Sequence, residues 1–286
     1  MSNGAVKREH KYHAEAEVLR GDLRLPLVQE IKTQASAKLA EEGGYLSQHE
    51  HDYQLEGVIR FDKAYTQTSG NPGLKPGVGW TTLSTSVVEG LNVLEVVTAD
   101  RVVSQIALDH PLEGYVPAIH FLGTRFENLR IAGHPIEVDL DLNHLGSKPG
   151  NDAPYTKGVG FIDRVNRQHE LVRKHPNLLE ELMQRYTGVS PDVEEPEAIE
   201  CSLVNQASEQ AGGRFPGESH GHVIYIPGFG IVSLANLRIE QSDYKPGTGI
   251  PRKTLVQLTM IELKMGCSAD GNGSVGTTKG NGTTMP

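Results

Sequence analysis

The chain has 286 residues, of which 37% are hydrophobic, and it contains 32 glycines and 16 prolines. This length allows one large β domain or two smaller ones with a sizeable core, and the glycine and proline content indicates many turns. Lysine and arginine total 27 against 36 for aspartate and glutamate, a formal net charge of -9 without a local basic patch, which excludes general nucleic-acid binding.

The two ends of the chain differ from its middle. Residues 1–13 are mainly polar and predict a mobile N-terminal arm. They lack the apolar core of a secretory signal, and no apolar run is long enough to span a bilayer, so we expect a cytoplasmic protein without a membrane partner. Residues 268–286 are rich in glycine, serine, threonine and asparagine, which predicts a disordered tail unless a neighbouring subunit holds it.

The first strand signals follow the N-terminal arm. Residues 14–27 alternate in hydrophobicity and predict a hairpin or a bulged strand, and residues 54–61 predict a further strand. Residues 28–42 leave helix and strand open, because good helix formers stand in a stretch that also alternates.

A glycine- and proline-rich stretch, residues 69–79, predicts a long surface loop. Trp80, the only tryptophan, follows it and is expected to anchor in the core. Residues 81–97 predict two strands joined by a tight turn near Gly90, and residues 101–108 predict another strand.

The stretch 114–142 holds the clearest strand signal. Gly133 and Pro135 divide it with turn chemistry, which predicts a hairpin. After the turn, apolar and acidic residues alternate with the period of a strand that has one buried face. The apolar set is Ile136, Val138, Leu140 and Leu142, and the acidic set is Glu137, Asp139 and Asp141.

A looser version of this stretch recurs about a hundred residues later in the chain. Residues 115–131 and residues 225–239 share a Tyr-x-Pro start, a Phe and Gly in the middle and an Asn-Leu-Arg-Ile end. The spacings between these shared residues differ. A duplicated hairpin unit and chance reuse of similar residues both remain open.

The period changes from that of a strand to that of a helix in the region of residues 161–187. Pro176 divides this region, which predicts a helical hairpin with Asp163 as the N-cap of its first helix. An acidic linker, residues 189–200, follows. Further strands are predicted at 201–205, 222–226, 231–239 and 254–265, the last apolar on both faces and therefore central in a sheet.

These signals together predict a mainly β protein, an antiparallel β-sandwich or flattened barrel over residues 14–267, with the helical hairpin inserted at 161–187. The chain has two cysteines, Cys201 and Cys267. We expect both to be small packing groups rather than a disulfide, because a reducing compartment disfavours the bond.

Two His-x-His pairs are the main chemical feature. On a strand, residues two apart share a face, so each pair could present two imidazoles to one metal ion. The predicted ligands are His49, His51, Glu56, His220 and His222, with Fe, Mn, Ni or Zn as the transition metal. The competing interpretation is that these histidines are exposed at strand ends or bonded to loop backbone.

The first pair resembles part of the first motif of the cupin family, in which a glycine is followed by His-x-His and then a glutamate. The matching residues are Gly43, His49, His51 and Glu56. The resemblance ends at Glu56: Gly57 follows directly, but the glycine that the family has further along after this glutamate is missing, as is the family's Gly-Pro-Gly-His segment. What it implies is a metal-dependent, cupin-like enzyme.

The acidic face of the predicted strand at 136–142 offers a second kind of metal site. Glu137, Asp139 and Asp141 could bind Ca²⁺ together with loop oxygens, although a solvated strand face has the same pattern. Sugar recognition beside a Ca²⁺ ion at Asp139 and Asp141 is a third hypothesis, based on architecture alone.

Known catalytic motifs do not occur in the sequence: it has no Gly-x-Ser-x-Gly elbow, no cysteine at a helix start and no phosphate-binding loop. The leading hypothesis is a non-enzymatic binding or self-assembly (structural) module that acts through its loops and tail. Such a module would form a homo-oligomer through the tail or through strand edges. The alternative is a metal-dependent enzyme or metal-binding protein that uses the paired histidines.

Overall fold

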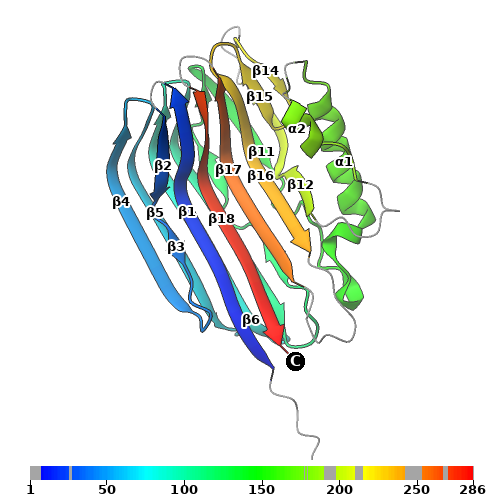
Figure 1. The fold of residues 1–286 in the computed structure, drawn as a ribbon. Coiled ribbons are helices and arrows are strands. Elements are labelled where there is room, and N and C mark those ends of the chain that lie inside the picture. Colours follow the sequence, from blue (N-terminus) through cyan, green and yellow to red (C-terminus); the bar gives the residue numbers. More distant parts are fainter. Residues whose placement is uncertain are drawn as a thin grey trace, which may run out of the picture.

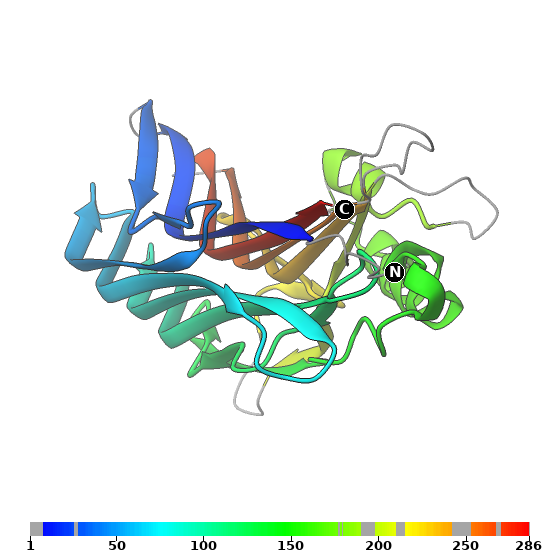
Figure 2. The same ribbon diagram turned by 90° about the horizontal axis from the view of Figure 1, so that it is seen from below.

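The structure is a computed structural model that describes residues 8–25, 28–176, 178, 180–189, 198–209, 215–241, 253–266 and 270–285. These residues form two antiparallel sheets of nine strands each, packed face to face, with two α-helices at one side (Figures 1 and 2). The predicted antiparallel β-sandwich with a helical insertion is confirmed.

The first sheet, sheet A, combines the two ends of the chain. Its order is β14-β15-β16-β17-β18-β1-β2, with β12 also pairing with β16 and β3 with β1. The strands are β1 (Glu9–Leu25), β2 (Gln29–Gln34), β3 (Ala37–Lys38), β12 (Ala198–Ser202), β14 (Glu218–His220), β15 (Val223–Ile226), β16 (Gly230–Gln241), β17 (Thr254–Gly266) and β18 (Asp270–Met285).

The second sheet, sheet B, is largely a meander of the N-terminal half. Its order is β13-β11-β10-β7-β6-β5-β4, and β8 and β9 also pair with β7. The strands are β4 (Gly44–Leu55), β5 (Ile59–Pro72), β6 (Val78–Val93), β7 (Val97–Pro111), β8 (Ala118–His120), β9 (Arg125–Glu127), β10 (Arg130–Ile131), β11 (His134–Leu140) and β13 (Val204–Glu209).

The helical layer consists of α1 (Val159–Arg173) and α2 (Glu180–Arg185), preceded by the 3-10 turns Gly150–Asp152 and Tyr155–Lys157. Both helices lie at one side of the sandwich, beside the edge of sheet A that holds β12, β14 and β15 (Figures 1 and 2). The helical hairpin is confirmed, but its N-cap is Gly158 and not Asp163, which lies inside α1. A small apolar cluster joins this layer to the sheet through Val172, Leu178, Leu182, Tyr186, Val223 and Ile231.

Serine hydroxyls of sheet B reach directly across the sandwich to sheet A. Ser84 on β6 donates to the carbonyl of Lys279 at 2.7 Å, and Ser86 donates to the carbonyl of Glu17 at 2.9 Å. Ser104 on β7 bonds the hydroxyl of Thr278 at 2.7 Å. Because these links need short side chains on both faces, the two sheets approach closely around β18.

The prediction of a disordered C-terminal tail is wrong. Residues 270–285 form β18, which pairs with β17 on one side and with β1 on the other. Gly280 and Gly282 fit this central place because residues of the facing sheet lie close to their Cα atoms. A Cβ on Gly280 would lie 2.8 Å from Leu108 Cδ1.

Other predictions for the N-terminal half need smaller corrections. Residues 9–13, expected in a mobile arm, are the start of β1, and residues 1–7 lie outside the described residues. The open question at residues 28–42 is settled in favour of strands β2 and β3. The loop expected at 69–79 is shorter, because β5 extends to Pro72 and β6 begins at Val78.

The turn predicted near Gly90 is also wrong, since β6 continues through this residue to Val93. The chain instead reverses at Leu94 and Glu95, whose φ angles are 51° and 59°. Positive φ at both central positions is the geometry of a type I′ turn, which normally carries asparagine or glycine. Asn92 supports this turn by accepting a hydrogen bond from the backbone N–H of Glu95.

The hairpin predicted within residues 114–142 is confirmed as β10 and β11, with Ile131 opposite His134. The looser repeat at residues 225–239 takes a different form. Residues 115–131 supply short strands that pair with β7, whereas residues 230–241 form one long strand of sheet A. The predicted central position of residues 254–265 is confirmed by β17, which lies between β16 and β18.

The cross-sheet hydroxyl bonds are expected to contribute measurably to stability. Replacing Ser104→Ala would leave the buried Thr278 hydroxyl without this partner, and we expect a loss of about 1–3 kcal/mol in the free energy of unfolding. Urea unfolding measures this loss. Ser47→Ala, at a hydroxyl on the edge strand β4, is the control and should change stability by less than about 0.5 kcal/mol. Equal effects of the two variants would contradict the interpretation.

Candidate functional site

Two clusters of polar side chains lie where the helical layer meets sheet A. The first is a charged cluster around Arg185, at the end of α2, which lines a cavity of about 360 Å³. The second is a histidine–glutamate cluster at the β14–β15 hairpin, formed by His175, Glu218 and His220.

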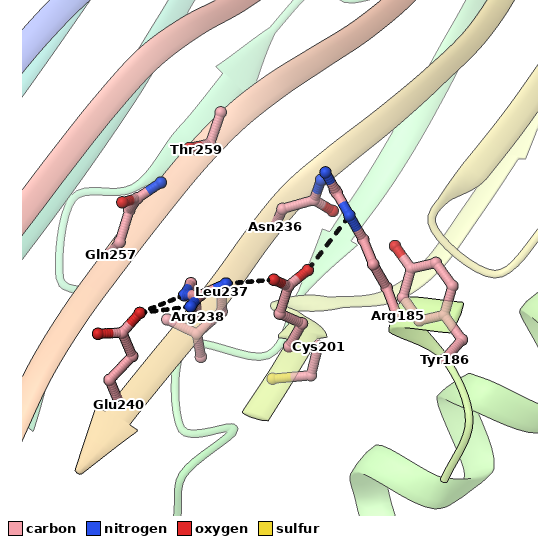
Figure 3. Close-up of a pocket in the computed structure, with 10 residues that line it drawn as sticks. Arg185, Tyr186, Cys201, Asn236, Leu237, Arg238, Glu240, Gln257 and Thr259 are labelled. Carbon is pink, nitrogen blue, oxygen red and sulfur yellow. Dashed lines mark hydrogen bonds and ion pairs between the residues drawn. The ribbon is translucent and has the colours of Figure 1, made fainter. Parts of the chain in front are cut away.

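The charged cluster is a continuous set of ion pairs between the helical layer and three strands. Arg185 forms two hydrogen bonds with the carboxylate of Glu262, at 2.9 and 3.0 Å. Arg238 on β16 donates to Glu200 at 2.6 Å and to Glu240 at 2.6 Å. Figure 3 shows Arg185 reaching from the helical layer and Arg238 lying beside Glu240.

The electrostatics of this cluster favour a structural role. Burial disfavours the charge of Arg185, but the carboxylates of Glu262 and Glu200 outweigh this effect and raise its pKa. Each of the three glutamates of the cluster has an arginine partner. Burial also raises the pKa of the Cys201 thiol far above its ordinary range, so that this cavity presents no activated thiolate. The cluster therefore holds the helical layer to the sheet.

A buried tyrosine–histidine pair lies behind Arg185. The hydroxyl of Tyr186 is 2.9 Å from Nε2 of His222. Burial lowers the pKa of His222 to about 3, so its imidazole is neutral at physiological pH. His169 contacts the ring of Tyr186. Its Nδ1 accepts the backbone N–H of Gly188, so Nε2 carries the proton that is donated to the carbonyl of Glu200.

The expectation that His220 and His222 face the same way is wrong. His220 is the last residue of β14 and Val223 is the first of β15, and these two residues pair with each other. Gly221 and His222 therefore form the hairpin turn, with Gly221 at a φ of 62°. Glycine at the first central position suits such a turn. The reversal sends His222 to Tyr186 and leaves His220 at the end of β14.

His220 belongs to a different group, in which one ligand atom each from His175, Glu218 and His220 lie within 4.8 Å of one another. Glu218 and His220 are two apart on β14 and so project from the same face. His175 follows the C-terminal end of α1 and is 3% exposed. Its ring centroid lies 4.7 Å from that of His220 and 6.0 Å from that of Tyr225.

The first predicted pair, His49 and His51, lies on the edge strand β4 and is exposed, as is Glu56 in the following turn. His49 bonds the hydroxyl of Ser47 at 3.1 Å and stacks on Tyr65. Among the described residues, the one group of three convergent ligands does not include them. The fold therefore brings no further ligand to the residues that resemble the cupin motif, and metal binding at this pair stays a prediction.

The acidic residues Glu137 and Asp139 of β11, and Asp141 just after it, likewise belong to no group of three convergent ligands in the described part of the chain. Asp139 accepts a hydrogen bond from Asn205 at 2.8 Å. Asp141 accepts the backbone N–H of Asn143 and lies 3.4 Å from His144. These contacts are those of an ordinary solvated strand and its following turn.

Sequence reasoning missed His175 and Glu218. Glu218 and His220 form a Glu-x-His pattern, and this spacing could have predicted two ligands on one face of a strand. His175 had no comparable signal, because it is separated from β14 by α2 and meets it only through tertiary packing.

A comparison with models of known protein families gives a match over most of the chain. Residues 10–240 match the family model described as Domain of unknown function (DUF8256). The chain belongs to this family. The matched stretch contains His175, Glu218 and His220, whereas β17 and β18 lie beyond it. A search of curated proteins found no match, and neither did a search of solved structures. Among the described residues, no helix has the length and apolar character needed to cross a membrane.

The buried neutral histidines predict a loss of stability in mild acid. Burial lowers the pKa of His222 and of His110 to about 3 and that of His10 to about 4, so the unfolded chain binds protons at a higher pH than the folded chain. The contribution of these histidines to the free energy of unfolding is therefore fully present above the pKa of the unfolded chain, near 6.5, and it is lost as the pH falls below that value. Lowering the pH from 7.5 to 5.5 is expected to reduce the free energy of unfolding by about 1 kcal/mol for each such histidine.

Urea unfolding at these two pH values measures the effect. His222→Gln, which cannot be protonated, should reduce the difference between the two pH values by about 1 kcal/mol. The control His51→Gln alters an exposed histidine and should leave the difference unchanged. An unchanged difference in His222→Gln would contradict the assignment of a buried neutral imidazole.

Proposed function

We propose that this protein binds one divalent transition-metal ion through His175, Glu218 and His220. The observation that carries the proposal is the convergence of one ligand atom from each of these residues to within 4.8 Å. The chain segments that supply them, the end of α1 and the strand β14, are far apart in sequence and meet at this point.

The donor set favours a particular class of ion. Two imidazole nitrogens and one carboxylate oxygen suit Zn²⁺ and neighbouring transition metals, whereas Ca²⁺ prefers six or more oxygen ligands. Burial, assisted by the nearby His220, lowers the pKa of His175, which keeps this imidazole in the neutral form that binds metals. Three protein ligands leave at least one coordination position for water or a substrate.

A cavity separated from the three ligands by the side chain of Tyr225 offers room for a second ligand. Tyr225, whose ring contacts His175, also lines a cavity of about 870 Å³ on the outer face of sheet A. The cavity extends to Lys264 on β17 and Arg24 on β1. A metal ion held beside this cavity would act as a Lewis acid toward a ligand bound there.

Metal titration tests the proposal. Calorimetric titration of the wild-type protein with Zn²⁺ should give one site per chain, and His220→Ala should weaken the affinity at least about 100-fold because it removes a ligand. The matched control is the double variant His49→Ala/His51→Ala, which removes the exposed pair on β4 and should bind Zn²⁺ like wild type. Loss of binding in the double variant with full binding in His220→Ala would contradict the proposal and favour the β4 pair.

A second candidate function, self-assembly through a strand edge, is supported by β4. This strand ends the order of sheet B, and none of its residues is buried. Its Tyr45 is 66% exposed. On the outer side of such an edge strand, the backbone N–H and C=O groups are available to pair with a strand of a second copy of the chain. The hypothesis of assembly through the C-terminal tail is no longer supported, because β18 lies inside sheet A with a neighbouring strand on each side.

Light scattering after size-exclusion chromatography tests edge assembly. Wild type should be a dimer in equilibrium with monomer, and Tyr45→Asp on β4 should shift this equilibrium about tenfold toward monomer through charge repulsion. Leu74→Asp is the control, because Leu74 is 100% exposed on the loop between β5 and β6. A wild-type protein that is monomeric at all concentrations would exclude this second candidate.

A further inference from the structure

The cavity of about 360 Å³ beside Arg185 has a floor on the outer face of sheet A. This floor is made of side chains from three neighbouring strands: Glu200 on β12, Asn236, Arg238 and Glu240 on β16, and Gln257 and Thr259 on β17. Strand register brings them to one face, because Arg238 is paired with Glu200 on one side and with Gln257 on the other. Arg185 and Tyr186, from the helical layer, form the wall of the cavity (Figure 3).

The charged groups that line the cavity compensate one another. Arg238 donates to Glu200 at 2.6 Å and to Glu240 at 2.6 Å. Nε of Arg185 lies 3.6 Å from the carboxylate of Glu200. A charged ligand would have to displace these pairs and leave one partner of each without its counter-charge. The cavity therefore favours a ligand without net charge.

Three neutral or partly engaged groups of the floor remain available to such a ligand. The side-chain amide of Gln257 makes no hydrogen bond to the other residues of the cavity (Figure 3). Arg238 contacts Glu240 through Oε1, which leaves Oε2 of this carboxylate as an acceptor. The hydroxyl of Thr259 is 3.2 Å from that of Thr277 and keeps further hydrogen-bonding capacity. Donors and acceptors thus lie side by side.

A ligand with several hydroxyl groups matches this arrangement. Each hydroxyl both donates and accepts, so one can donate to Oε2 of Glu240 while its neighbour accepts from the amide of Gln257. The volume of about 360 Å³ is at the lower end of the range for ligand pockets, which suits one sugar ring rather than a polymer. The floor residues lie on paired strands and are fixed by ion pairs, so little ordering is needed on binding.

We propose that this cavity binds a neutral polyhydroxyl ligand of the size of one monosaccharide ring. Glu240 accepts from one hydroxyl, and Gln257 and Thr259 bond its neighbours. The ion pairs that hold the helical layer also keep these groups in place. This site is separate from the divalent site proposed above, because the two share no residue. It also differs from sugar recognition at β11, since it uses no Ca²⁺.

Saturation-transfer NMR of the full chain tests the site with glucose, galactose, mannose and myo-inositol as separate probes. At least one should bind with a Kd of about 1 mM or tighter. EDTA is present throughout, so the result does not depend on the proposed metal ion. Gln257→Leu should weaken the affinity at least about tenfold, because it removes the amide without touching an ion pair. Gln67→Leu, the same change on β5 outside the cavity, is the matched control.

The charge of the probe gives a test that needs no variant. Glucuronate should bind at least about tenfold more weakly than the best neutral probe, because both arginines already have partners and its carboxylate would face Glu240. Three results would each overturn the proposal: no binding of any neutral probe, glucuronate binding as tightly as the best of them, or unchanged binding in a Gln257→Leu variant with native circular dichroism.

Discussion

The hydrogen bonds that cross the sandwich set the distance between its two sheets. Sheets packed face to face usually lie about 10 Å apart, with long apolar side chains between them. Around β18 the contact is instead made by the hydroxyls of Ser84, Ser86 and Ser104, two of which bond backbone carbonyls of sheet A. A carbonyl in a sheet ladder has a second lone pair for such a bond. The close approach therefore requires small residues on both faces.

The composition of β18 follows from this constraint. Glycine and threonine supply little apolar surface, but the strand gains backbone hydrogen bonds to both β1 and β17. Large side chains would collide with the facing sheet, as the position of Leu108 against Gly280 illustrates. By filling the gap between β1 and β17, β18 joins the N-terminal strand to the C-terminal half of sheet A and makes the sheet continuous.

The histidine–glutamate cluster and the buried pair of His10 and His110 occupy opposite ends of this framework. The cluster of His175, Glu218 and His220 contains a carboxylate, which suits the proposed divalent ion, and Tyr225 separates it from a cavity. The pair of His10 and His110 is buried, and burial lowers the pKa of both imidazoles, which keeps them neutral. The ion pairs around Arg185 stabilise the helical layer on which the first site depends.

The sequence by itself determined the class of fold, because the period of two in residues such as Ile136, Val138 and Leu140 is a local property of a half-buried strand. It also located the helical insertion and the central strand β17 from their apolar patterns. The His-x-His pairs brought attention to His220, one of the three residues of the proposed divalent site. Local patterns are sufficient for these features because each is decided by neighbours in the chain.

Only the tertiary structure decided how the C-terminal residues are ordered and which residues form the histidine–glutamate cluster. Composition alone suggested that β18 could not order itself, because it gives no sign that β18 pairs with β1 from the other end of the chain as well as with the neighbouring β17. The turn at Gly221 separated His222 from His220, and packing of α1 brought in His175. His10 and His110 meet because two sheets face each other there. Such contacts depend on strand register and sheet packing, which no local period encodes.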